Sequence, residues 1–79
     1  MMTDYEYTGE PVEIAERPSA SRDVLRLTRV RHAGEAVARV DLRYWTLHAD
    51  GSETPHRGGL RLTVDEARAL RRALNDLDL

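Results

Sequence analysis

Arginines and a single tryptophan recur at spacings of two and four residues in the middle of the chain. The residues with this spacing are Arg39, Arg43, Trp45, Arg57 and Arg61. Successive side chains of an extended strand alternate between two faces, so the first three would share one face. Guanidinium groups that follow phosphates, beside an aromatic ring that stacks on bases, hold single-stranded nucleic acid in many proteins. The pattern predicts such a face, although a lone tryptophan is also typical of a core or an interface.

The charge of the chain is unevenly distributed. The formal net charge of −2, taken alone, argues against a nucleic-acid partner. Residues 1–16 contain five acids and no arginine, whereas residues 17–63 contain nine arginines and five acids. All twelve basic residues are arginines, whose planar fork pairs bidentately with phosphate. Arg29 and Arg31, two positions apart in the basic segment, are therefore further candidate phosphate-binding residues.

Residues that often perform catalysis lie in contexts that do not favour it. The histidines, His32, His48 and His56, fall in or beside different predicted turns, without the short spacing that places two metal ligands on one helical face. The chain has no cysteine, no phosphate-binding glycine loop and no nucleophile motif. We therefore expect no metal, no cofactor, no small-molecule substrate and no enzymatic activity.

Most of the segments that carry these residues have strand patterns. They cover residues 11–16, 23–31, 36–47 and 59–64, with a turn at 32–35 and a hairpin signal at Asp50-Gly51. A loop before the strand at 59–64 is expected to carry Arg57. In residues 36–47 the even positions, such as Val40 and Leu42, would face a core, and the odd positions would form the opposite, polar face.

The end of the chain has the pattern of an amphipathic helix. Thr63 and Glu66 fit the capping box, in which each side chain bonds a backbone N–H of the other residue. One apolar stripe follows at helical spacing, made of Ala67, Leu70, Leu74 and Leu77. The fold class predicted is α+β: an antiparallel sheet of about four strands followed by one C-terminal helix. Residues 1–22 are interpreted as a mobile acidic tail and linker, with a short strand as an option at 11–16, and residues 23–79 as the domain.

A family resemblance adds to this interpretation. Residues 40–45 (VDLRYW), the Asp50-Gly51 turn and residues 54–62 (TPHRGGLRL), which lead into the helix, resemble the positive-cofactor-four transcriptional coactivator family. These are small single-stranded-DNA-binding proteins with a whirly-like fold. The resemblance covers residues 24–79. It departs from the family pattern at Thr54, Gly58 and Glu35, where basic residues are usual.

The resemblance implies a curved sheet and a homodimer held together through the helix. The apolar stripe, Ala67, Leu70, Leu74 and Leu77, would then belong to the dimer interface. Arg43 would correspond to the strand arginine of the family, Trp45 to its stacking tryptophan and Arg57 to the basic residue of its loop. A dimer also fits the size of the chain, because 79 residues without disulfides rarely form a sufficient core alone.

Together these observations predict a dimer that binds single-stranded DNA without sequence specificity, with RNA left open, in transcription, replication or repair. The transcription machinery would be a further partner. The location expected is the cytoplasm, or the nucleoid in a prokaryote, and no membrane partner is expected. The alternative is a protein-interaction module that keeps the fold with little affinity for nucleic acid. The acidic tail could compete with phosphates for the arginines, or could simply keep the chain in solution.

Overall fold

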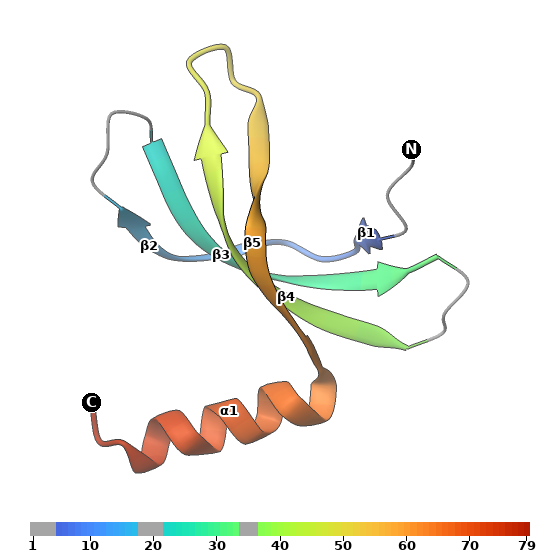
Figure 1. The fold of residues 1–79 in the computed structure, drawn as a ribbon, viewed down its shortest axis with the longest axis vertical. Helices are drawn as coiled ribbons and strands as arrows, with labels where there is room; N and C mark the ends of the chain where they lie inside the picture. The colour runs from blue at the N-terminus through green and yellow to red at the C-terminus, as the bar shows by residue number, and fades with distance from the viewer. Residues whose placement is uncertain (1–4, 18–21, 34–36) are drawn as a thin grey trace.

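The computed structural model describes residues 5–17, 22–33 and 37–79. These residues form one antiparallel sheet of five strands followed by a C-terminal helix (Figure 1). The elements are β1 (Tyr5–Tyr7), β2 (Val12–Arg17), β3 (Arg22–His32), β4 (Ala38–Leu47), β5 (Glu53–Thr63) and α1 (Val64–Asp76). The α+β class and the order of sheet then helix are confirmed, and the sheet has five strands where about four were expected. In the part of the chain described, no helix has the length and apolar character needed to cross a membrane.

The N-terminal segment forms an interrupted edge strand. β1 and β2 both pair antiparallel with β3, β1 opposite its C-terminal end and β2 opposite its first half. We call residues 5–17 the N-terminal strap. The strand expected at 11–16 is present as β2. Residues 5–7 were expected to belong to a mobile tail, but they form a strand that pairs with β3. The reason is that backbone hydrogen bonds to the edge of β3 attach this segment, and residues 6–17 all remain exposed, so they carry little apolar pattern.

β4 lies between β3 and β5 and pairs with both along most of its length. The predicted Asp50-Gly51 hairpin joins β4 to β5: Gly51 has a φ of 90°, which suits glycine, and the Asp50 carboxylate accepts the Ser52 backbone N–H at 2.9 Å. Residues 18–21 of the predicted linker and residues 34–35 of the predicted 32–35 turn lie outside the described residues.

β5 begins at Glu53 and includes Arg57, so the loop expected to carry Arg57 is wrong. Pro55 lies opposite Trp45 in the pairing of β5 with β4, and the register shifts between that pair and the next, Arg43 with Gly59. In the sheet order β5 is an edge strand, and a proline is tolerated there because its missing N–H breaks no central ladder. Proline and glycine therefore mark an irregular edge strand here.

The sheet has two faces that differ in chemistry. The tryptophan face carries Arg39, Asp41, Arg43 and Trp45 of β4, together with the side chains directly opposite them. The helix face carries the even positions of β4. The even positions Val40 and Leu42, expected to face a core, lie toward the helix and line a cleft shared with α1. The buried Val24 and Val30 instead lie opposite Trp45 and Arg39, on the tryptophan face.

α1 begins where the sequence predicts, after Thr63. The complete capping box is present: the Thr63 hydroxyl accepts the Glu66 N–H at 3.1 Å, and the Glu66 carboxylate accepts the Thr63 N–H at 2.8 Å. The helix lies below the helix face and contacts only β4 and β5 (Figure 1). No helix residue is buried, and the buried hydrophobic residues in the described part of the chain, Val24 and Val30, both belong to β3.

Candidate nucleic-acid interface

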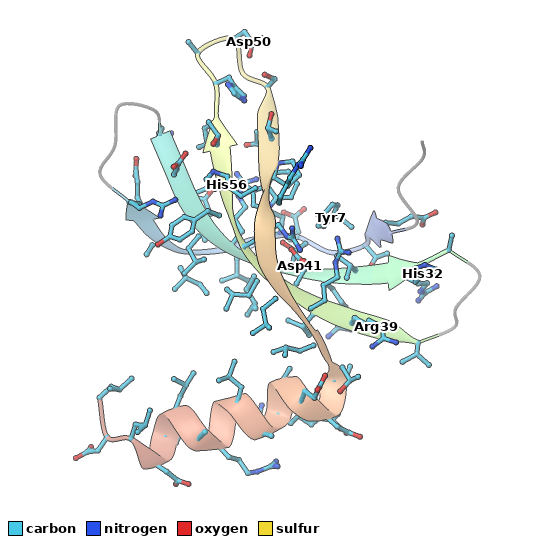
Figure 2. All side chains as sticks on the ribbon, viewed as in Figure 1. Tyr7, His32, Arg39, Asp41, Asp50 and His56 are labelled. Atoms are coloured by element: carbon cyan, nitrogen blue, oxygen red, sulfur yellow. The ribbon has the colours of Figure 1, made fainter. Side chains whose placement is uncertain are left out.

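The pairing of β3 with β4 determines which residues share the tryptophan face. Arg26 lies opposite Arg43, and Thr28 lies opposite Asp41. Residues directly opposite each other in an antiparallel pair point to the same side of the sheet. The predicted set Arg39, Arg43 and Trp45 is therefore brought together on one face, with Arg26 as an additional cation (Figure 2 shows the side chains in this region).

Asp41 is the centre of a buried ionic cluster on this face. Its side chain has 0 % exposure, although the sequence places it on a polar, solvated face. Arg43 donates from Nε to both carboxylate oxygens, at 3.0 and 2.7 Å, and from Nη2 to Oδ1 at 2.7 Å. Arg61 donates from Nε to Oδ1 at 3.2 Å. Two guanidinium groups thus surround one carboxylate, so this cluster carries a formal charge of +1.

Arg43 is held in a single position by its surroundings. Its Nη1 donates to the backbone carbonyl of His56 at 2.8 Å, and the hydrogen bonds of Asp41 raise the pKa of its guanidinium. The side chain lies across Gly59: a Cβ at that glycine would be 2.6 Å from Cζ of Arg43. Arg43 is therefore a fixed element of the face, and only 10 % of its side chain is exposed.

Trp45 is half-buried, with one aromatic and one cationic neighbour. The ring of Tyr7, from β1, meets it edge to face with centroids 5.2 Å apart. The Arg26 guanidinium lies 5.4 Å from the centroid of its ring. Trp45 is therefore neither a fully exposed stacking surface nor a fully buried core residue. The N-terminal strap partly covers its indole ring.

Sequence reasoning did not identify Arg26 and Tyr7 as part of this site. Arg26 is buried and donates to both oxygens of Glu53, at 3.0 and 2.9 Å, and to Glu13 of the strap at 3.0 Å. These bonds raise the pKa of Arg26 and lower that of Glu53. Alternation along β3 was the sequence signal that could have identified Arg26. It places Val24, Arg26 and Thr28 on the face opposite to the leucines.

The other predicted arginines are distributed differently. Arg39 is half-buried and lies on the tryptophan face, and Arg57 is exposed on β5. Because Val30 is directly opposite Arg39, its neighbours Arg29 and Arg31 point to the helix face. The structure therefore separates Arg29 and Arg31 from the group that the sequence placed them with.

His56 belongs to a second polar cluster, on the helix face. The Thr46 hydroxyl donates to Asp23 at 2.8 Å and lies 2.9 Å from Nε2 of His56. The Thr46 hydrogen bond and the nearby imidazole hold the pKa of Asp23 below its ordinary value. These side chains tie β3, β4 and β5 together at one end of the sheet.

The predicted interface stripe lines an open apolar cleft. The cleft has a volume of about 420 Å³, and its apolar walls are Leu27, Val40, Leu42, Leu62, Ala67, Leu70 and Leu74. Leu77 lies beyond it and is 65 % exposed. The apolar stripe of the helix therefore faces the sheet without being covered by it.

Neither a protein-family model, nor a curated protein, nor a solved structure matches this chain. The resemblance to the coactivator family thus remains a prediction from the motifs of residues 40–62.

Proposed function

We propose that this protein binds single-stranded nucleic acid, in the first place DNA, on the tryptophan face. The observation that carries the proposal is the cluster of Asp41, Arg43 and Arg61, with its formal charge of +1, on the same face as Trp45. Fixed guanidinium groups beside an indole match the two chemical parts of a single strand, the phosphates and the bases.

Within this proposal, Asp41 acts as a positioning residue. It orients the Arg43 guanidinium, so less side-chain freedom would be lost when a phosphate approaches. Arg57, exposed on the adjacent strand, would add long-range attraction. Stacking on Trp45 would contribute about 1–3 kcal/mol per base with little sequence preference.

We also propose that the functional unit is a homodimer joined along the α1 stripe. The support is the open cleft between the sheet and α1, together with the small number of buried apolar side chains. A second copy offers the same leucines, so its stripe and this one can cover each other across a two-fold axis.

The test is a fluorescence titration with oligo-dT of about 12 nucleotides, at salt concentrations from about 50 to 200 mM. Trp45 is the single tryptophan, so its emission reports on this face. We expect quenching, tighter binding of oligo-dT than of duplex DNA, and weaker binding at higher salt. Absence of quenching at low salt and micromolar protein would falsify the proposal.

A matched pair of variants locates the binding face. Arg57→Gln removes an exposed charge from β5, and Arg72→Gln removes the same charge from the exposed side of α1. Each lost phosphate contact lowers the slope of log K against log salt by about 0.7. We expect this reduction for Arg57→Gln and an unchanged slope for Arg72→Gln; equal slopes would mean that β5 at Arg57 does not contact the phosphates.

One observation favours the second candidate, a protein-interaction module. The guanidinium groups of Arg26 and Arg43 are already bonded to carboxylates, which reduces their capacity for phosphate. In that case the oligonucleotide would leave Trp45 emission unchanged, while disruption of the helix stripe would abolish self-association.

A further inference from the structure

A small cavity lies between the N-terminal strap and the tryptophan face. We call it the strap pocket; its volume is about 160 Å³. Its lining residues are Tyr7, Gly9, Pro11, Arg26, Thr28, Trp45 and Glu53. Two aromatic side chains thus contribute to the walls, and the Arg26–Glu53 ion pair contributes the polar part.

Three residues of this lining each hold a polar atom that makes no hydrogen bond within the described part of the chain. These atoms are Arg26 Nε, Thr28 Oγ1 and Trp45 Nε1, and all are closed to solvent. Buried polar atoms without partners are uncommon in native proteins, because each loses its hydrogen bond to water without replacement. Three such atoms belong to residues that line one pocket, so we infer that a ligand reaches them when residues 8–11 move outward.

The chemistry of these atoms defines the ligand they would accept. The indole and the guanidinium Nε can only donate, and the threonine hydroxyl can do both. The ligand must therefore bring acceptors, and carbonyl oxygens are the strongest neutral ones among the nucleobases.

The volume of the pocket narrows the choice further. A cavity of about 150 Å³ is known to hold one benzene ring. The strap pocket is of that size, so it suits a six-membered ring and is small for the two fused rings of a purine. Aromatic walls also suit a flat ring.

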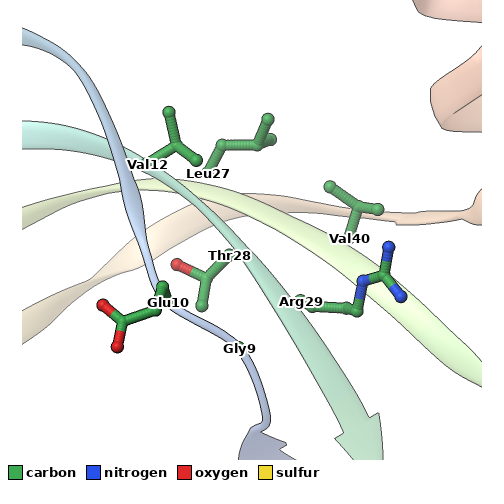
Figure 3. A pocket seen from close by; sticks show the side chains of 7 residues that line it. All are labelled: Gly9, Glu10, Val12, Leu27, Thr28, Arg29 and Val40. Atoms are coloured by element: carbon green, nitrogen blue, oxygen red, sulfur yellow. The ribbon is translucent and has the colours of Figure 1, made fainter.

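The strap is attached in a way that would let a ring enter. Residues 8–11, which join β1 to β2, are all exposed, and Thr8 is bonded to the Arg29 carbonyl at 2.9 Å. A second hollow, of about 340 Å³, lies along the same segment and is also lined by Gly9 (Figure 3). Because Gly9 lines both hollows, an outward movement of residues 8–11 would cost mainly the hydrogen bonds of Thr8 to the Arg29 carbonyl.

We propose that the strap pocket takes one pyrimidine base that carries two carbonyl groups, thymine or uracil, from a bound single strand. The inference rests on the proposed function and deepens it. It adds a preference for particular bases to a surface that otherwise binds phosphates and stacks on any base. The Thr28 hydroxyl would donate a hydrogen bond to a carbonyl oxygen of the base, and the Trp45 ring would contact the base as part of the pocket wall.

The test compares oligo-dT with oligo-dA of equal length, on the full chain and its Thr28→Val variant. Valine has nearly the shape of threonine without the hydroxyl. We expect the variant to lose about five- to tenfold in affinity for oligo-dT, the usual effect of one hydrogen bond, and to bind oligo-dA unchanged. Its thermal midpoint should stay the same or rise, because the hydroxyl has no partner in the free protein.

Two further variants serve as controls. Thr28→Ser keeps the hydroxyl and should keep the preference for oligo-dT. Thr54→Val removes a hydroxyl from the exposed hairpin, where it lies 2.9 Å from His48, and should change neither affinity.

The outcomes separate the two proposals. If the unmodified protein binds neither oligonucleotide, the proposed function fails and the pocket with it. If it binds both, but Thr28→Val weakens them equally or not at all, the pocket alone is overturned. A lower thermal midpoint for Thr28→Val would also overturn it, since the hydroxyl would then have a structural partner.

Discussion

Gly59 and Arg43 illustrate how single residues build the candidate site. They lie opposite each other on β5 and β4, and the arginine reaches Asp41 and the His56 carbonyl by crossing the glycine. The position therefore needs a residue without a Cβ. Gly58, the preceding residue, has no atom within 4 Å of where its Cβ would be. Substitution of these two adjacent glycines by alanine should therefore affect the stability of the fold differently.

Gly59→Ala should lower the free energy of unfolding by about 1–3 kcal/mol, as overpacking of a filled site does. Gly58→Ala should remain within about 0.5 kcal/mol of the unmodified protein, as is usual for surface substitutions. Urea unfolding followed by Trp45 fluorescence measures both. Equal effects of the two substitutions would show that Arg43 is not held against Gly59.

At the scale of elements, α1 depends on its first turn, because its apolar stripe is not buried in one chain. The Glu66 carboxylate accepts the Thr63 backbone N–H, and this bond holds the pKa of Glu66 below its ordinary value. A lowered pKa means that the ionised form stabilises the folded state. Its contribution is present above the unfolded pKa of about 4.3 and is lost as pH falls through the folded pKa.

Glu66→Gln imitates the protonated side chain, so its effect should depend on pH. We expect this variant to have a lower thermal midpoint than the unmodified protein at neutral pH. The two midpoints should converge as the pH falls through the folded pKa of Glu66, where Glu66 itself becomes protonated. Glu10→Gln, an exposed carboxylate of the strap, is the control and should follow the unmodified protein throughout. A constant difference for Glu66→Gln across this range would contradict the capping role.

At the scale of the whole molecule, the proposed homodimer would cover apolar surface that the single chain leaves open. The chain measures 38 × 37 × 20 Å, and the cleft between the sheet and α1 is open. If a second copy covers this surface, folding and association are one equilibrium. A tenfold higher protein concentration would then stabilise the dimer by about 1.4 kcal/mol.

Leu74→Asp tests this assembly, because Leu74 lines the cleft. Sedimentation should give a dimer for the unmodified protein and a monomer for the variant, and the concentration dependence of the thermal midpoint should disappear. Arg72→Asp places the same acid on the opposite side of the helix and should leave the dimer intact. A monomer at all concentrations for the unmodified protein would exclude the homodimer.

The sequence pattern was sufficient to predict those elements that depend on residues close together in the chain. The Asp50-Gly51 hairpin and the Thr63–Glu66 cap of the helix were predictable, and the structure confirms both. The strand expected at residues 36–47 is present as β4, but burial along it does not alternate as predicted, because Asp41 is its most buried residue. The α+β class followed from the same signals. For the site, alternation correctly placed Arg39, Arg43 and Trp45 together.

Tertiary structure alone decided which segments meet. Pairing with β3 made residues 5–7 a strand and brought Tyr7 onto Trp45, and no short-range pattern encodes that partner. Two arginines from different strands buried Asp41, although alternation marked it as solvated. Thus the sequence by itself determined that Arg39, Arg43 and Trp45 share a face of β4, and where the helix begins, because alternation and capping are local. The contents of the tryptophan face depended on pairing between residues distant in the chain, which only the folded sheet specifies.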